Sequence, residues 1–373
     1  MESFGPMNIP NKSNAKVVVA MSGGVDSSVA AALLSQQGCH VVGVTLRVVP
    51  EERTGSVFEP CCSLAAAEDA RQVAERLGIP HVVLNYVERF ENDVIADFLE
   101  EYQKGRTPNP CIRCNVHIKF GALWDKAREL GAGFLATGHY ACIERREGRM
   151  TLTRAQHLDK DQSYVLAGLG QEHLEHALFP LGTLPKSETR RLAASLELVT
   201  ADRPESQEIC FVPDDNYRRF LAERIGPFKP GPIVSVTGEI LGQHQGLPYY
   251  TIGQRRGLGI AAPRPYYVIR LDAQRNAVIV GHEEDTFSAM LVARQVNWCS
   301  MAPQEAPFEA EVKIRYRHTP AAATVTPVEG GFRVEFREPQ RSVTPGQWAV
   351  CYRDDVVLAG GIIEAFGNCE AEL

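Results

Sequence analysis

The stretch VVVAMSGGVDSS, residues 17–28, decides the fold of the first part of the chain. Its apolar run leads directly into Ser22, Gly23 and Gly24, and a helical pattern begins a few residues later. Glycine permits a positive φ and a close approach to the backbone, and the amides at the start of a helix attract anions. A strand, a glycine loop and a helix in this order predict a phosphate-binding loop.

The side chains of this loop support the same interpretation. Ser22 and Ser27 add hydroxyl donors, and Asp26 could hold a Mg²⁺ ion on bound phosphates. The loop is not a Walker A motif, because no Gly-Lys-Ser/Thr follows the glycines at the required spacing. A glycine turn capped by Asp26 and a serine is the simpler alternative, since such turns begin many helices.

The first 210 residues alternate strands with helices. Short apolar runs predict buried strands at residues 16–21, 40–46, 80–85 and 133–138. Amphipathic stretches predict helices at residues 28–37, 65–77, 92–103 and 118–130. This alternation indicates an α/β fold with a parallel sheet covered by helices on both faces, whose ligands bind beyond the carboxyl ends of the strands.

The pattern changes near Pro213. A helical stretch at residues 217–225 precedes a Gly- and Pro-rich region, and from about residue 289 short alternating β segments are separated by turns. That spacing predicts a small closed barrel. We therefore expect a parallel-sheet α/β domain, a small central domain and a C-terminal β-barrel, at residues 1–212, 213–288 and 289–373.

Composition places the chain among ordinary globular proteins, with 44% hydrophobic and 23% charged residues in 373. No apolar run approaches the roughly 18 residues that span a bilayer, and the polar N-terminus lacks a signal peptide, so we expect a cytoplasmic protein without a membrane partner. The net charge is −7, but residues 51–100 carry the whole acidic excess and residues 101–150 are basic. A nucleic-acid partner is therefore not excluded.

The second informative stretch is TPNPCIRCN, residues 107–115. Its two prolines keep it extended before a helix that we expect to begin near His117. A thiol ahead of a helix N-terminus and beside Arg113 should have a lowered pKa and exist partly as thiolate. A single Cys-x-x-Cys pair leaves zinc, redox and iron–sulfur roles open, because a structural zinc site usually has a second pair.

Among the other cysteines, Cys210 in ESQEICFV (205–212) is the third chemical candidate. The adjacent Cys61 and Cys62 could be reactive or structural, and we leave them outside the active site. The remaining cysteines stand singly in apolar, strand or tail contexts, where a small buried residue is the default for most of them.

Five motifs in one order resemble a known family. The glycine loop, TPNPCIRCN, ATGHYA (136–141), DKDQSYVL (159–166) and ESQEICFV follow one another in one chain. This combination resembles the tRNA-specific 2-thiouridylases, which are tRNA-uridine 2-sulfurtransferases among the PP-loop ATP pyrophosphatases. The resemblance extends over roughly residues 15–365 and implies a PP-loop catalytic domain, a small central domain and a C-terminal barrel that binds tRNA.

The resemblance also implies a reaction. ATP with Mg²⁺ would adenylate O2 of the wobble uridine, U34, and sulfur would replace that oxygen to give 2-thiouridine, AMP and pyrophosphate. Cys210 matches the position that carries a persulfide, received from an upstream sulfur carrier or cysteine desulfurase. Cys114 matches the catalytic partner that resolves the intermediate, forming a disulfide with Cys210. The family implies tRNAs for Lys, Glu and Gln as substrates.

Two sets of binding residues follow from the same resemblance. The positions that match ATP contacts are Ala20, Met21, Ser22, Gly23, Gly24, Val25, Asp26, Ser27, Leu46 and Gly138. The positions that match contacts with the target base and the tRNA are Asn109, Pro110, Cys111, Lys160, Asp161, Gln162, Arg315 and Tyr316.

The chain departs from the familiar pattern at Cys111, where many members carry Asp. Cys111, Cys114 and Cys210 together offer three thiolates, which could hold a [4Fe–4S] cluster with one open iron that delivers sulfide. The alternative is that Cys111 is a tolerated small residue. The sequence leaves the persulfide relay and the cluster open, because it does not show whether the three thiols converge.

Other classes of protein remain as alternatives. A tRNA 2-thiocytidine synthase should show paired Cys-x-x-Cys motifs, an argininosuccinate-type ligase would not need Cys210, and an RNA-binding adaptor would not need intact cysteines. Residues 254–257 could form a phosphate-contact loop or a solvated turn. His139 could be a general base or a structural histidine, and we expect Trp348 in the barrel core.

Overall fold

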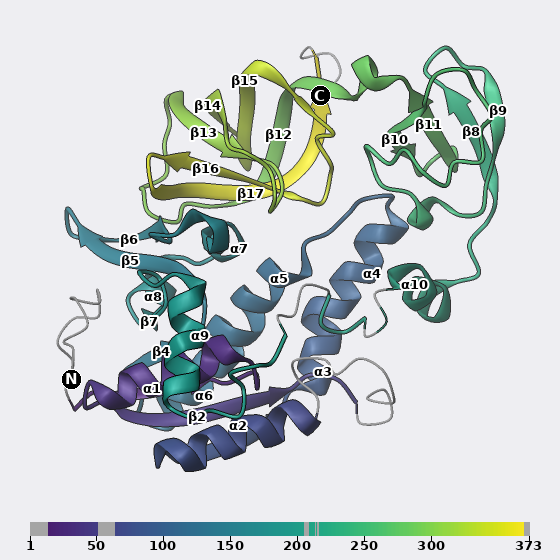
Figure 1. Cartoon of the computed structure of the whole chain (residues 1–373). Helices are drawn as coiled ribbons and strands as arrows, with labels where there is room; N and C mark the ends of the chain where they lie inside the picture. Colours follow the sequence, from purple (N-terminus) through teal and green to yellow (C-terminus); the bar gives the residue numbers. More distant parts are fainter. Residues whose placement is uncertain (1–13, 51–63, 205–208, 213, 215, 369–373) are drawn as a thin grey trace.

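The computed structural model describes residues 14–50, 64–204, 209–212, 214 and 216–368. Figure 1 shows a sheet with its helices in the lower part of the molecule, and a barrel and a smaller sheet side by side above it. The pair Cys61 and Cys62 lies outside the described residues. None of the helices in the described part of the chain is long and apolar enough to cross a membrane.

The lower sheet is parallel throughout, in the order β3-β2-β1-β4-β7. Its strands are β1 (Lys16–Ala20), β2 (His40–Arg47), β3 (His81–Asn85), β4 (Phe134–Ala136) and β7 (Ala177–Leu178). The four strands predicted from apolar runs are confirmed. The fifth was not predicted, because a strand of two residues leaves no pattern in the sequence.

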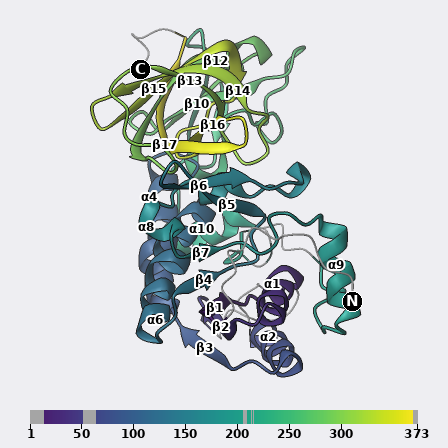
Figure 2. The same cartoon turned by 90° about the vertical axis from the view of Figure 1, so that its left-hand side faces the viewer.

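Helices cover both faces of this sheet, as Figure 2 shows for α1 and α2 on one side and α6 on the other. One face carries α1 (Val25–Gln36) and α2 (Leu64–Leu77); the other carries α3 (Val87–Phe90), η2 (Glu91–Ile95), α4 (Ala96–Gln103), α5 (Pro110–Arg113), η3 (Cys114–Leu123) and α6 (Trp124–Glu129). Val17 and Val19 of β1 pack with Leu33 of α1, whereas Val18 packs with Ile118 of η3. All are almost fully buried, which explains why β1 is uniformly apolar.

Six strands close the predicted C-terminal barrel, because β12 pairs with both β15 and β17. They are β12 (Phe287–Asn297), β13 (Phe308–Lys313), β14 (Ala321–Val328), β15 (Gly331–Arg341), β16 (Trp348–Arg353) and β17 (Val356–Gly367). A hairpin from the first part of the chain, β5 (Ala141–Arg146) and β6 (Arg149–Arg154), extends this sheet through the pair Thr153 and Val356. The sequence did not predict this attachment, since only the fold brings the hairpin to the edge of the barrel.

The central region contains a four-stranded sheet in the order β10-β11-β8-β9. Its strands are β8 (Gly231–Ser235), β9 (Ile240–His244), β10 (Tyr267–Asp272) and β11 (Ala277–Gly281). The remaining helices are η4 (Leu158–Lys160), α7 (Ser163–Leu166), α8 (Gln171–Leu174), α9 (Lys186–Ser195), α10 (Tyr217–Ile225), η5 (Leu247–Tyr249) and η6 (Glu283–Thr286). The helix α10 has the bounds that the sequence predicted.

Strand β16 joins the barrel to the α/β domain because both of its faces are buried. Ala349 and Cys351 point into the barrel core, whereas Trp348 and Tyr352 belong to the hydrophobic core of the α/β domain together with Tyr164. Our expectation that Trp348 lies in the barrel core is therefore wrong. The apolar run of β16 has two cores to fill, and sequence alone does not say which residue faces which core.

A cluster of aromatic rings attaches the segment 209–212 and α10 to α4. The ring of Phe98 lies 4.9 Å from Tyr102, 5.1 Å from Phe211 and 6.3 Å from Phe220. Phe98 is only 1% exposed. The segment that carries Cys210 is therefore held by packing against α4.

We predict that Phe98→Ala lowers the free energy of unfolding by about 3–5 kcal/mol, because it empties a large buried site. Denaturant unfolding followed by circular dichroism measures this change. The control Phe287→Ala, at a ring that is 39% exposed, should change stability by about 1 kcal/mol or less. Equal losses of unfolding free energy in the two variants would show that the ring cluster contributes no more to stability than an exposed ring.

Candidate active site

The glycine loop has the geometry that its sequence predicts. Gly23 has a φ of 71°, and a Cβ atom placed there would lie 2.3 Å from the carbonyl oxygen of Ala66. The helix α1 begins directly after Gly24, whose carbonyl accepts hydrogen bonds from the hydroxyls of Ser27 at 3.1 Å and Ser28 at 2.9 Å. The loop is thus a tight turn at the carboxyl end of β1, where a bound anion would meet the start of α1.

Asp26 of this loop is held by two side chains that the sequence analysis missed. Lys186, at the start of α9, places its Nζ 2.6 Å from Oδ1 and 2.8 Å from Oδ2 of Asp26. The hydroxyl of Tyr140 donates to Oδ1 at 2.8 Å. Tyr140 lies in the quoted motif ATGHYA, but Lys186 stands 160 positions away from Asp26, so no local pattern connects them.

This arrangement fits the chemistry of a magnesium-bound triphosphate. A carboxylate is a ligand that Mg²⁺ prefers, and a lysine ammonium is a compact charge that binds phosphate. The Lys186 side chain is only 11% exposed, so its charge is directed at the loop and not into bulk water. Asp26 and Lys186 are the residues that would hold the metal and a phosphate group.

Gly138, a predicted ATP contact, lies directly against the loop. A Cβ atom there would lie 2.7 Å from the carbonyl carbon of Asp26 and from the amide nitrogen of Ser27. Met21 and Leu46 are almost fully buried, and Thr45 of β2 donates to the carbonyl of Met21 at 2.8 Å. The predicted ATP residues of three neighbouring strands therefore meet at one edge of the sheet.

The helix after the second motif begins earlier than predicted. It begins at Pro110 and not near His117, because Asn109 caps it by accepting from the amides of Cys111 at 3.2 Å and Ile112 at 3.4 Å. Cys111 is exposed in the first turn, and Cys114 is half-buried one turn later. Our expectation of a thiol just ahead of the helix is thus wrong. The signal that we overlooked is Asn-Pro, which is typical of a helix cap followed by its first residue.

Cys114 and Cys210 are brought to the same part of α4. Arg113, beside Cys114, forms an ion pair with Asp97, and Phe211, beside Cys210, packs on the neighbouring Phe98. Both cysteines pack against one hydrophobic core. The sequence neighbours of two cysteines that are 96 positions apart thus contact adjacent residues of one helix.

The seven cysteines among the described residues form no disulfide in this structure. Within residues 14–50, 64–204, 209–212, 214 and 216–368, no group of three or more His, Cys, Asp or Glu side chains is arranged to hold a metal ion. Cys111, Cys114 and Cys210 therefore do not form a ligand set for a [4Fe–4S] cluster here.

The predicted tRNA contacts of two distant segments meet beside the barrel. The hydroxyl of Tyr316 donates to the carbonyl of Asp161 at 3.3 Å, and its ring lies 6.2 Å from that of Tyr164. The side chain of Asp161 is buried and accepts from Ser163 Oγ at 2.8 Å and from the amide of Ala155 at 3.0 Å. Asp161 therefore fixes the segment, whereas its neighbour Lys160 belongs to the short helix η4.

The segment with Asn109 and Pro110 is tied to the barrel as well. Gln347 Nε2 donates to the carbonyl of Thr107 at 2.9 Å. A cavity of about 220 Å³ lies between the two parts, with Asn109, Arg113 and Trp348 among its lining residues. Sequence pattern did not reveal this cavity, because its walls come from α4, the 107–113 segment and the barrel.

Arg315 lies in a basic part of the barrel. Its guanidinium donates to the carbonyl of Arg341 at 3.0 Å, and burial lowers its pKa from the ordinary value. Lys313 Nζ lies 5.7 Å from the ring centre of the buried Tyr164 and 5.6 Å from that of Tyr316, which is 39% exposed, so a cation lies beside an exposed aromatic ring at this surface. Such a surface suits contacts with both phosphates and bases.

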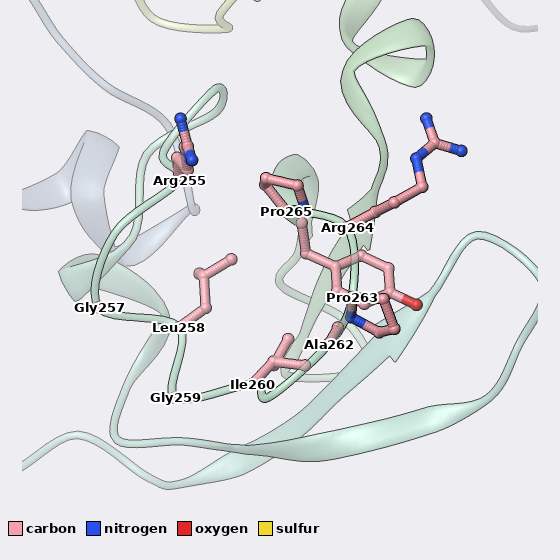
Figure 3. A pocket seen from close by; sticks show the side chains of 10 residues that line it. Arg255, Gly257, Leu258, Gly259, Ile260, Ala262, Pro263, Arg264 and Pro265 are labelled. Atoms are coloured by element: carbon pink, nitrogen blue, oxygen red, sulfur yellow. The ribbon is translucent and has the colours of Figure 1, made fainter.

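Two features that the sequence left open can be placed. His139 is buried and its Nδ1 lies 2.7 Å from Thr137 Oγ1; burial lowers its pKa well below the usual value, which fits a structural histidine better than a base. Arg255 belongs to a loop that lines a hollow in the central region. Figure 3 shows Arg255 and Leu258 on one side of this hollow and Arg264 on the other. The loop at residues 254–257 is therefore one wall of the hollow.

We predict that Gly138→Ala weakens ATP binding at least about tenfold, because the new methyl group overlaps the backbone of Asp26 and Ser27. Isothermal titration with ATP measures this. Gly133→Ala is the matched control, since a Cβ atom there meets nothing within 4 Å, and it should bind ATP normally. Normal binding in both variants would remove Gly138 from the site.

Comparison with known proteins agrees with this geometry. Family models described as the tRNA methyl transferase HUP domain, the tRNA methyl transferase PRC-barrel domain and the aminomethyltransferase β-barrel domain match residues 15–214, 218–282 and 288–363. Several relatives are named tRNA-specific 2-thiouridylase MnmA. The one from Symbiobacterium thermophilum is 53% identical over 94% of this chain and 92% of its own length. The one from Geobacter metallireducens is 51% identical over 95% of this chain and 98% of its own length. The relative from Heliobacterium modesticaldum is 52% identical over 93% of this chain and 92% of its own length. The chain therefore belongs to the tRNA-specific 2-thiouridylase family.

Proposed function

We propose that this protein uses ATP to replace O2 of the tRNA wobble uridine by sulfur. The observation that supports this most is the placement of three kinds of group in one molecule. A phosphate loop with Asp26 and Lys186, a pair of cysteines beside α4, and basic and aromatic groups of the barrel are linked through neighbouring segments. ATP activation, sulfur transfer and RNA binding each need one of these groups.

The first step is adenylation of the base. A uracil carbonyl is a poor electrophile, so O2 attacks the α-phosphorus of ATP, pyrophosphate leaves and the N3 proton is lost. Mg²⁺, when bound, neutralises charge on the phosphates. Asp26 would hold the metal, the loop amides would hold phosphate oxygens, and Lys186 would stabilise the charge of the departing pyrophosphate.

The second step moves sulfur. The terminal sulfur of a persulfide on Cys210 attacks C2 of the activated uridine, and AMP leaves. The thiolate of Cys114 then attacks Sγ of Cys210, which forms a Cys114–Cys210 disulfide and releases 2-thiouridine as the N3 proton returns. An external reductant restores the two thiols. This relay uses two thiols and no iron–sulfur cluster.

This reaction implies particular partners. The substrates are tRNAs with an unmodified wobble uridine, which the family implies are those for Lys, Glu and Gln. An anticodon-loop base leaves its stacked neighbours at little cost, so it can reach a cavity such as the one beside Asn109. The sulfur arrives as a persulfide from an upstream carrier protein or cysteine desulfurase.

We predict that Cys114→Ser and Cys210→Ser each abolish formation of 2-thiouridine, whereas Cys111→Ser retains most activity, because only two thiols take part in the relay. Mass spectrometry of anticodon nucleosides measures the product after incubation with ATP, Mg²⁺, a persulfide donor and unmodified tRNA. The control is Cys39→Ser, a half-buried cysteine in the core on the other side of the sheet, which should be fully active.

Other results of this assay have defined meanings. Loss of activity in Cys111→Ser, together with bound iron and sulfide in anaerobically prepared protein, would replace the relay by a cluster mechanism. A methylated nucleoside in place of a thiolated one would favour the methyl transfer that the names of the family models suggest.

We predict that Arg315→Ala weakens tRNA binding about tenfold and makes it less sensitive to salt, because a cation at the phosphate backbone is lost. Filter binding over a salt series measures both quantities, and ATP affinity should stay the same. Arg275→Ala is the control, since Arg275 lies in a different sheet and its side chain is 82% exposed. An unchanged tRNA affinity in Arg315→Ala would place this residue outside the interface.

A further inference from the structure

Tyr140 connects the phosphate loop to the segment that matches tRNA contacts. Its hydroxyl donates to Asp26 Oδ1 at 2.8 Å. Its backbone is held on both sides by Gln162: the amide of Tyr140 donates to Gln162 Oε1 at 3.0 Å, and its carbonyl accepts from the amide of Gln162 at 2.8 Å. One residue thus contacts both a predicted ATP ligand and a predicted tRNA contact.

The surroundings of Tyr140 make this connection stiff. Tyr140 is 2% exposed, and its hydroxyl also lies 2.9 Å from Thr189 Oγ1 of α9. Lys186, on the same helix, pairs with Asp26 and lies 5.8 Å from the centre of the Tyr140 ring. A packed ring has few alternative rotamers, so a shift of its backbone moves its hydroxyl relative to Asp26.

Gln162 carries this connection into the segment that matches tRNA contacts, between the buried residues Asp161 and Ser163. Asp161 is anchored by three hydrogen bonds to Ala155 and Ser163. Gln162 accepts from the amide of Val165 at 3.1 Å within its own segment, and its bonds to the strand end lead to Tyr140. Gly138, two residues before Tyr140, touches the backbone of Asp26 directly. A nucleotide that binds at residues 160–162 therefore acts on the same strand end that supports the phosphate loop.

We propose that Tyr140 is a positioning residue through which tRNA binding sets the position of Asp26, so that ATP is cleaved only when tRNA is bound. This inference rests on the proposed function. Both oxygens of Asp26 lie within hydrogen-bond distance of Lys186 in this structure. When tRNA displaces Gln162, the Tyr140 hydroxyl turns the carboxylate, so that one oxygen faces the metal and Lys186 turns to phosphate.

The test compares pyrophosphate release by the full-length protein with and without unmodified tRNA. In Tyr140→Phe the ratio of the two rates should fall about tenfold or more, while the Kd for tRNA stays within about twofold of the wild-type value. Tyr86→Phe is the matched control: it loses a hydroxyl that donates to the carbonyl of Ala122 at 3.0 Å, away from the loop, and should keep the wild-type ratio.

Two further variants separate coupling from simple support of the fold. Thr189→Val removes the other partner of the Tyr140 hydroxyl but keeps its bond to Asp26, so the ratio should stay the same. Gln162→Ala should lower the ratio, and combining it with Tyr140→Phe should lower it no further, because both act through one connection. Gln162→Ala also serves if Tyr140→Phe does not fold.

Several outcomes would overturn the inference. They are an unchanged ratio in Tyr140→Phe, an equal loss in Thr189→Val, or losses from Tyr140→Phe and Gln162→Ala that multiply in the double variant. The wild-type reaction tests the proposed function separately. If wild-type protein forms no 2-thiouridine, the proposed function fails; if it does and the Tyr140→Phe ratio is unchanged, only the coupling fails.

Discussion

The parallel pairing of β1 with β4 is the constraint on which the site depends. Because Val17, Val18 and Val19 pair with residues 134–136 in register, the chain leaves both strands at the same edge of the sheet. The loop after β1 and the segment after β4 must then occupy one small space. Only glycines at the contact allow this, since a side chain at Gly138 would overlap the loop backbone.

A single hydrophobic core shared by two domains explains how distant segments become one surface. Strand β16 closes the barrel with one face and covers the α/β domain with the other, and Tyr164 donates to the carbonyl of Trp348 at 3.0 Å across this boundary. Apolar burial of this kind fixes the relative position of the two domains. The segments at 107–111, 160–162 and 313–316 therefore form one surface, although each belongs to a different part of the chain.

The charge of Asp26 lies at the centre of the proposed chemistry. A carboxylate that is two-thirds buried needs a partner, and Lys186 and Tyr140 supply one cation and one hydrogen bond. The same three groups suit a metal, a phosphate and a link to the segment that matches tRNA contacts.

The sequence by itself determined the strands around 16–20, 40–47, 81–85 and 134–136, the glycine loop, the barrel and the resemblance to a family, because these depend on local periodicity and on short motifs. It did not reveal Lys186 as the partner of Asp26, the attachment of β5 and β6 to the barrel, or the side of β16 on which Trp348 lies. The dipeptide Asn109-Pro110 is typical of a helix start, so the sequence did contain the signal for a helix that begins at Pro110. The sequence left open whether Cys111 lies close enough to Cys114 and Cys210 to hold a cluster with them, because the distance between separate segments depends on the fold. Only the tertiary structure decided the long-range points, because each depends on contacts between residues far apart in the chain. Such contacts result from packing, and no local sequence pattern predicts them.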